Sequence, residues 1–269
     1  LVEELDYHRE LANQTLFGRL WEGHPLVRVP RPFPEHSSSR VLCQTFHRGL
    51  HFDDFVDAAR PEEKRLAVFV LNDFVFDSMH RFHIFNGDPH PGNYLFGEDG
   101  SITFLDYGCV KVFQPGFIER LQAFNRSIIE ADHAAFEAHI RALGLVLPGR
   151  PYDHDFMWGF FAYHAEPFAT DRVFRFSSEY VRRAGAVMSP LEVRRLNLPP
   201  DLLFFNRITF GLNAIFAKLD AEANFYQLYR RYAYPSEDRP PSLATLGIPL
   251  PEAFVRAAPS PVERPTVSA

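Results

Sequence analysis

Residues 86–96 read NGDPHPGNYLF, and this stretch decides the fold. Its two prolines fix φ and its second glycine permits positive φ, so the segment cannot continue the helical pattern that precedes it. We expect a rigid, irregular loop that holds Asp88 and Asn93 five residues apart, just before an apolar run. His90 stands between the two prolines and is expected to brace the loop by hydrogen bonding rather than to act in catalysis.

A hairpin and a third polar site follow this loop. Residues 94–96 (YLF) and 102–106 (ITFLD) are predicted to be short strands, and the Gly/Asp-rich segment 97–101 (GEDGS) is the turn between them. Asp106 lies at the end of the second strand and is followed directly by Tyr-Gly. The hairpin therefore connects the loop to a second carboxylate.

The order of loop Asp, Asn five residues later, hairpin and second acid matches the phosphoryl-transfer site of protein kinases. ATP phosphates are anionic, so hard oxygen ligands must hold Mg²⁺ between them while one carboxylate stays near the incoming nucleophile. The pattern predicts Asp88 as the catalytic residue, Asn93 and Asp106 as metal ligands, and ATP and Mg²⁺ as cofactors. Asp and Asn are also ordinary turn residues, which would explain Asp106 alone but not the joint pattern.

The remaining sequence is mostly helical in pattern. Residues 1–21 are predicted to be a helix that starts without a cap, and residues 61–85 a single long helix that is apolar on most sides. Residues 26–34 and 40–46 read as two short strands. From residue 115 to about 232 most segments have helical spacing.

Composition excludes several classes of protein. The 269 residues are 46% hydrophobic, enough for one large or two small domains. A net charge of -6, with 28 basic and 34 acidic residues, gives no footprint for nucleic acid. Cys43 and Cys109 form no metal-binding motif and are expected to be core thiols in a reducing compartment. No apolar run approaches the roughly 18 residues of a membrane span, so we expect a cytoplasmic protein that could contact a membrane surface.

Three segments resemble the UbiB (AarF-type) atypical kinases. FNGDPHPGNYLF and GSITFLDYG are similar to that family's DPHPGN catalytic loop and LDFG metal-binding segment. ELDYHRELAN, at 4–13, resembles its ExD stretch, and residues 198–225 are similar to its C-terminal helical region. The resemblance implies an α+β, protein-kinase-like fold, with a mostly helical C-lobe and a partial, small, β-containing N-lobe.

The resemblance also implies a nucleotide site. Glu4 and Asp6 match the ExD pair, Glu10 matches the glutamate of the helix called αC in kinases, and Leu42 to Thr45 would offer backbone groups to adenine. Asp6 and Glu10 are like charges at i and i+4, which weaken an isolated helix unless a cation lies between them. An acidic helix start favoured by the macrodipole explains Glu4 and Asp6 equally well.

The sequence departs from the family in lacking the phosphate-clamping half of the site. It has only three lysines, none before Glu10, and neither a KxGQ helix nor a nucleotide-covering loop. The chain is therefore expected to be a fragment of a longer protein or a degenerate member. We expect a partial N-lobe at 1–48, a helical C-lobe at 49–234 and a Pro-rich tail at 235–269.

For function, the resemblance implies Mg-ATP-dependent phosphoryl transfer or ATP hydrolysis, in support of isoprenoid-quinone or lipid metabolism. The expected partners are a nucleotide and an isoprenoid lipid or membrane surface, and nothing in the sequence indicates the oligomeric state. Two alternatives stay open. One is a small-molecule phosphotransferase of the aminoglycoside or choline kinase type, and the other is a non-catalytic pseudokinase module.

Overall fold

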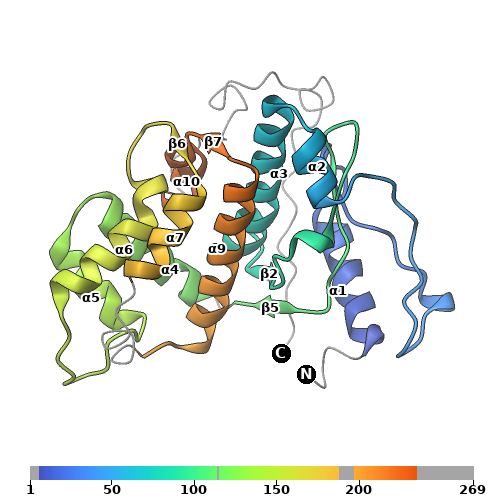
Figure 1. Ribbon diagram of the computed structural model, residues 1–269. Coiled ribbons are helices and arrows are strands. Elements are labelled where there is room, and N and C mark those ends of the chain that lie inside the picture. The colour runs from blue at the N-terminus through green and yellow to red at the C-terminus, as the bar shows by residue number, and fades with distance from the viewer. Residues whose placement is uncertain (1–5, 114, 188–196, 235–269) are drawn as a thin grey trace. The chain divides into compact units, whose positions relative to one another are not determined.

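The computed structural model divides the chain into two compact units (Figure 1). The first ends at Val112 and the second starts at Phe113. The structure describes residues 6–113, 115–187 and 197–234. Glu4 and the predicted tail at 235–269 lie outside the described residues, so the predictions made for them stay predictions, as do the predicted domain boundaries.

The first unit is built around α3. The elements of this unit, in chain order, are α1 (Tyr7–Leu20), β1 (Val27–Arg28), a 3-10 turn (Pro34–His36), α2 (Phe52–Ala58), α3 (Pro61–His80), β2 (Ile84–Asn86), a second 3-10 turn (Pro91–Asn93), β3 (Tyr94–Phe96), β4 (Ile102–Phe104) and β5 (Val110–Val112). In α3, the consecutive residues from Val68 to Leu71 are all at most 1% exposed. Consecutive helical residues point in four directions, so α3 is packed on all sides, as its apolar pattern predicted.

The prediction that one helix runs from 61 to 85 is wrong at its C-terminal end. The helix stops at His80, and His83 adopts a positive φ of 55°. Residues Ile84–Asn86 then form β2, which pairs antiparallel with β5 in the register Ile84↔Val112. The apolar residues that looked like a last helical turn are a strand because β5, which was not predicted, supplies their hydrogen-bonding partner.

The hairpin prediction is confirmed. Strands β3 and β4 pair antiparallel with Tyr94 opposite Phe104 and Phe96 opposite Ile102. Strand β1 adds to the other edge of β4, in parallel. Asn93 immediately precedes β3 and Asp106 follows β4 by two residues, so the open end of the hairpin brings the two predicted metal ligands to one place.

The predicted strands at 26–34 and 40–46 are shorter than expected. Only Val27–Arg28 forms a regular strand, and the two segments otherwise meet through single bridges, such as that between Pro32 and Gln44. Prolines at three alternate positions from Pro30 on remove the donors that a regular ladder needs. The buried Gln14 of α1 holds both segments, because its amide donates to the Pro30 carbonyl and to Gln44 Oε1.

Two further predictions about the first unit are corrected. Helix α1 does have a cap, since Asp6 accepts a hydrogen bond from the His8 amide at 3.1 Å. Helix α2, between the predicted strands and the predicted helix at 61–85, was not predicted. Cys43 and Cys109 form no disulfide, but both are half-buried rather than core residues.

The second unit is helical, as predicted. Its described elements are α4 (Pro115–Ile129), α5 (His133–Ala142), α6 (His154–Ala169), β6 (Phe174–Arg175), α7 (Ser178–Val187), α9 (Pro200–Lys218), β7 (Glu222–Ala223) and α10 (Phe225–Ala233). A short antiparallel pair, β6–β7, was not predicted. Phe176, Phe216 and Phe225 are fully buried against one another in its core. Within the described ranges, no helix combines the length and the apolar character needed to cross a membrane.

Candidate functional site

The DPHPGN loop is braced by its own hydrogen bonds. The His90 amide donates to the Asp88 carbonyl at 2.8 Å, and the Asn93 amide donates to the His90 carbonyl at 2.9 Å. His90 Nδ1 accepts from the Gly92 amide at 3.1 Å, which confirms the bracing role expected for this side chain. The loop therefore presents Asp88 and Asn93 from a fixed backbone.

Two strand ladders hold this loop against the segment that carries Asp106. On one side, β2 pairs with β5 and the ladder continues through the Gly87 amide, which donates to the Cys109 carbonyl at 2.6 Å. On the other side, β3 pairs with β4 and continues through the Leu105 amide, which donates to the Asn93 carbonyl at 2.9 Å. Both ladders extend beyond their strands. The DPHPGN loop and the segment around Asp106 therefore cannot shift without breaking main-chain hydrogen bonds.

The three predicted side chains converge. Asn93 Nδ2 lies 3.3 Å from Asp88 Oδ2 and 3.4 Å from Asp106 Oδ2. All three residues are half-buried, so part of each is exposed to solvent. The other Asp106 oxygen, Oδ1, accepts from the Gly108 amide at 2.8 Å, which fixes the orientation of this carboxylate.

This arrangement suits a divalent cation. Asn93 Nδ2 donates long hydrogen bonds to two carboxylates, and a cation between these two like charges would stabilise them. Within the described residues there is no group of three or more His, Cys, Asp and Glu that could hold a metal ion. A set of two carboxylates and one amide is nevertheless what Mg²⁺ uses in phosphate sites, where water and the substrate phosphates complete its coordination.

Tyr94 lies beneath the two acids. It is buried, and burial, followed by the charges of Asp88 and Asp106, raises the pKa of its phenol above the usual value. The phenol therefore stays neutral near the carboxylates. Sequence reasoning treated Tyr94 only as a strand residue.

Helix α1 binds both main-chain polar groups of Tyr107, the residue after Asp106. Glu10 Oε1 accepts from the Tyr107 amide at 3.3 Å, and Asn13 Nδ2 donates to the Tyr107 carbonyl at 2.9 Å. Burial raises the pKa of Glu10, the hydrogen bond from Tyr107 opposes this, and the charge of Asp106 adds to the increase. A side chain at Gly108 would come within 3.3 Å of Asp106 Oδ1 and 3.7 Å of Glu10 Oε2, so glycine allows the two acids to approach.

Three positioning residues were missed by the sequence reasoning. Asn86 Nδ2 donates to the Asp106 carbonyl, whereas Asn86 had been read only as a mild departure from the family pattern. Asn13 lies three residues after Glu10 and hence on the same helix face, a spacing that would have identified it as a partner of the same segment. Tyr107 is fully buried and packs on Phe17 at 5.1 Å between ring centroids.

The other predicted nucleotide-binding residues are placed as follows. Asp6 is exposed and caps α1. The Thr45 amide donates to the Arg31 carbonyl and its hydroxyl accepts from the Arg31 amide, each at 2.9 Å, so both groups are engaged within the segment. Leu42 is half-buried. A role for these residues at a nucleotide stays a prediction.

Comparison with known proteins identifies similar chains. The family model for the ABC1 atypical kinase-like domain matches residues 1–140. An aarF domain-containing protein kinase of the Arabidopsis thaliana chloroplast is 28% identical over 148 residues, which cover 55% of this chain and 20% of that protein. The chloroplastic ACTIVITY OF BC1 COMPLEX KINASE 8 of the same plant is 26% identical over 153 residues, again 55% of this chain and 20% of the relative. The chain thus spans about a fifth of the length of these relatives.

A solved structure is similar in fold. The structure of Rv3197 from Mycobacterium tuberculosis, in complex with erythromycin, has a TM-score of 0.74 and 26% sequence identity to this chain. The similarity covers 88% of this chain and 60% of that one. The predicted α+β, protein-kinase-like fold is therefore confirmed.

Proposed function

The chain belongs to the family of ABC1 atypical kinase-like domains, and from this premise we propose that it binds Mg-ATP at Asp88, Asn93 and Asp106 and takes part in phosphoryl transfer or ATP hydrolysis. The observation that carries the proposal is the approach of both carboxylates to one side-chain amide, at 3.3 and 3.4 Å. The activity of the whole protein is part of the proposal, because the relatives are much longer than this chain.

Each residue has a distinct task in this proposal. Asp106 and Asn93 would hold Mg²⁺, which when bound neutralises the phosphate oxygens and orients them for transfer. Asp88 would orient the attacking oxygen and accept its proton, as the loop Asp does in protein kinases, and its Oδ2 lies 3.3 Å from Asn93 Nδ2. Glu10 and Asn13 bind the main-chain amide and carbonyl of Tyr107 and so keep Asp106 in position. Glu4, Asp6, Leu42 and Thr45 are proposed, on the family resemblance alone, to lie around the nucleotide.

The finer assignments are proposals that rest on resemblance to UbiB-type kinases. They are a role in isoprenoid-quinone or lipid metabolism, contact with an isoprenoid lipid or membrane surface, and a cytoplasmic location.

The test is a titration of the protein with a fluorescent ATP analogue, with Mg²⁺ and with a chelator in its place. It is made on this chain and on any longer protein that its gene encodes. We expect affinity that depends on Mg²⁺, loss of that dependence in Asp106→Asn, and near-normal binding in Asp88→Asn. Turnover in Asp88→Asn should fall about 100-fold or more, since a positioned general base contributes that much. Equal binding and turnover in wild type and both variants would refute the assignment.

The same material separates the two alternatives. Phosphorylation of an aminoglycoside or of choline, and not of a prenylated phenol, would favour a small-molecule phosphotransferase. Absence of Mg²⁺-dependent affinity in every form of the protein would favour a non-catalytic binding module.

A further inference from the structure

A cavity of about 870 Å³ opens in the first unit at the turn end of the β3–β4 hairpin. Asp88, Asn93, Asp106 and Glu10 are not among its lining residues, so it is separate from the site described above. Its volume lies within the range of roughly 300–1,000 Å³ that small-molecule sites occupy in proteins. A ligand in this cavity would sit at the opposite end of the hairpin from the acids.

One side of the cavity is apolar. It is formed by side chains of α2, α3, β3 and the segment before α2, which are Leu50, Phe55, Ala58, Ala59, Ala67 and Phe96. The rings of Phe55 and Phe96 stack on each other at 4.1 Å with an interplanar angle of 10° and are only 8% and 3% exposed, so they contribute a small, buried part of this lining. Leu50 is 45% exposed despite its size. Alanine side chains leave space beside the rings, so this side fits an aliphatic or planar apolar group.

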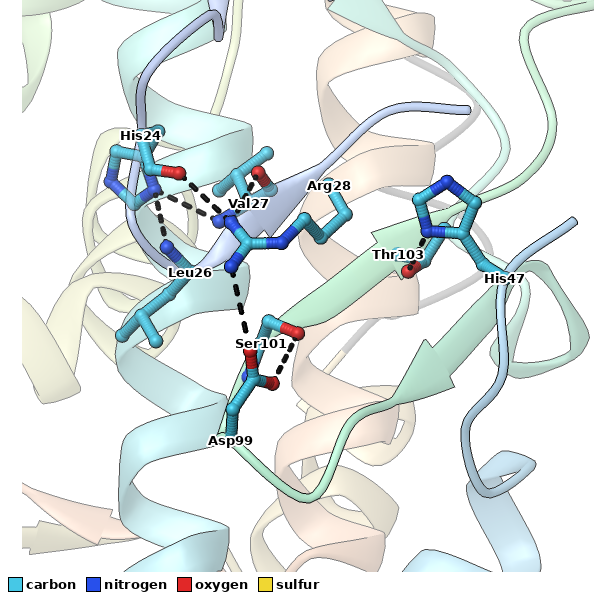
Figure 2. A network of polar contacts seen from close by, with 8 residues as sticks. All are labelled: His24, Leu26, Val27, Arg28, His47, Asp99, Ser101 and Thr103. Atoms are coloured by element: carbon cyan, nitrogen blue, oxygen red, sulfur yellow. Dashed lines mark hydrogen bonds and ion pairs between the residues drawn. The ribbon is translucent and has the colours of Figure 1, made fainter. Parts of the chain in front are cut away.

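Another part of the lining is polar and contains a weak ion pair. Figure 2 shows Arg28 reaching from β1 toward Asp99 in the hairpin turn. The two side chains are 36% and 61% exposed and their closest atoms, Arg28 Nη2 and Asp99 Oδ2, are 3.4 Å apart. A long, exposed pair of this kind contributes little to stability. An anionic ligand group can therefore share the Arg28 guanidinium with Asp99.

His47 lies beside Arg28 as a neutral group. Its ring nitrogens are 3.2 Å from Thr45 Oγ1 and 3.3 Å from Thr103 Oγ1 (Figure 2 shows the contact with Thr103). Burial, and then the charge of Arg28, lower the pKa of His47. The positive charge on this side of the cavity therefore comes from the arginines.

Arg48 is the cation that remains available to a ligand. It lines the cavity, is exposed, and makes no ion pair within the described part of the chain. Two of the three lining acids are already engaged: Glu63 binds Arg60 at 3.0 Å, and Asp99 binds Arg28. The third, Glu98, is exposed in the hairpin turn and opposes an anion.

We propose that this cavity binds an anionic amphiphile, whose apolar body packs on Leu50 and the neighbouring Ala58 and Ala59 and whose carboxylate or phosphate group binds Arg48 and Arg28. The proposal goes beyond the proposed function, since it uses neither Mg²⁺ nor ATP nor any residue of the acid site. A carboxylate and a phosphate monoester offer the same charge-assisted hydrogen bonds to a guanidinium, and only their measured affinities distinguish them.

The test compares four probes that share one tail: dodecanoate, dodecyl phosphate, dodecanol and dodecyltrimethylammonium, each below its micelle concentration. Binding to the full chain is measured by calorimetry without Mg²⁺ or nucleotide, so that a failure of the nucleotide proposal leaves the result unaffected. Both anions should bind about tenfold more tightly than dodecanol, as expected for a hydrogen bond to a charged group, and the cation more weakly still. The tighter anion identifies the head group. Equal affinity for all four probes would overturn the proposal.

Three variants locate the binding. Arg48→Gln should weaken binding of the anions about tenfold and leave dodecanol unchanged, because a charge-assisted bond is lost. Arg40→Gln removes the same charge from an exposed residue outside the cavity and should change nothing. Ala59→Leu should weaken all the probes by filling the apolar side. If Arg48→Gln and Arg40→Gln have the same effect on dodecanoate, the anion is not held at this cavity.

Discussion

The two ends of the β3–β4 hairpin carry similar residues in different hydrogen-bonding states. At the turn, Asp99 Oδ1 accepts from the Ser101 hydroxyl and amide, at 2.5 and 3.0 Å, and Oδ2 faces Arg28. At the open end, the Oδ2 atoms of Asp88 and Asp106 are both drawn to Asn93 Nδ2 at more than 3.2 Å. The first carboxylate has short bonds and a cation beside it, whereas the second pair shares the Asn93 amide through long bonds and Asp106 Oδ1 also accepts from the Gly108 amide.

This difference separates a structural turn from a candidate site. Asp and Gly occur at both ends, so these residue types alone do not distinguish them. At the turn a guanidinium lies beside the single carboxylate, whereas at the open end two carboxylates approach the same amide, and a cation bound there would stabilise both charges. The open end is therefore where a metal is expected, and the predictions below contrast the two ends.

The largest contrast is expected for the same substitution at each end. Asp106→Asn should lower Mg²⁺-dependent nucleotide affinity about 100-fold, at the upper end of the losses caused by disturbing a metal site. Asp99→Asn should leave that affinity within about twofold, because Asp99 is at the far end of the hairpin. Both affinities come from the fluorescent-nucleotide titration. Equal losses would mean that the effect is one of general destabilisation.

For stability, glycine substitutions should have the larger effect at the turn, at Gly100, and the smaller effect at the open end, at Gly108. Gly100 has a φ of +79°, and a methyl group there would lie 2.6 Å from Leu66 Cδ2. Gly100→Ala should therefore lower the free energy of unfolding by about 1–3 kcal/mol, as expected from strain and overpacking. Gly108→Ala should change stability less but weaken nucleotide binding by displacing Asp106. Urea unfolding and the nucleotide titration, applied to both variants, check this, and a larger stability loss in Gly108→Ala would contradict it.

The pH dependence of stability should have opposite signs for Glu10 and Asp99. Burial raises the pKa of Glu10 above 4.5, so its stabilising contribution is present below that pH and is lost as pH rises through the folded-state pKa. Burial also acts to raise the pKa of Asp99, but the bonds from Ser101 and the charge of Arg28 hold it below 3.8. The contribution of Asp99 is therefore present above that pH and is lost as pH falls.

Unfolding free energies between about pH 3 and pH 8 measure both effects. The free energy of unfolding of Glu10→Gln, relative to that of wild type, should increase as pH rises above about 4.5. The loss of unfolding free energy caused by Asp99→Asn should disappear as pH falls below about 4. Parallel curves for the two variants would show that their environments do not differ in the way described.

The smallest effect is expected at the cavity. Burial lowers the pKa of His47 and the charge of Arg28 lowers it further, so Arg28→Gln should raise that pKa. Titration of the His47 ring by NMR measures the change, and Arg40→Gln serves as the control. An unchanged pKa in Arg28→Gln would mean that burial alone sets it.

Much of the candidate site followed from local sequence. Proline and glycine act on their own backbone, so the loop from Asp88 to Asn93, its bracing by His90 and the hairpin turn could be read directly. The long buried α3 was also predicted, because an apolar pattern on all sides requires burial whatever surrounds it. These features depend on residues that are close in the chain.

What could not be predicted depends on residues that are far apart in the chain. The end of α3 at His80 is set by the pairing of β2 with β5, about 25 residues later. The hydrogen bond from Asn13 to the Tyr107 carbonyl joins residues separated by 94 positions. Sequence alone determined which side chains and which stiff loop were available, while packing decided which of them meet. A hydrogen bond depends on distance and angle in space, and only the folded backbone fixes these for distant residues.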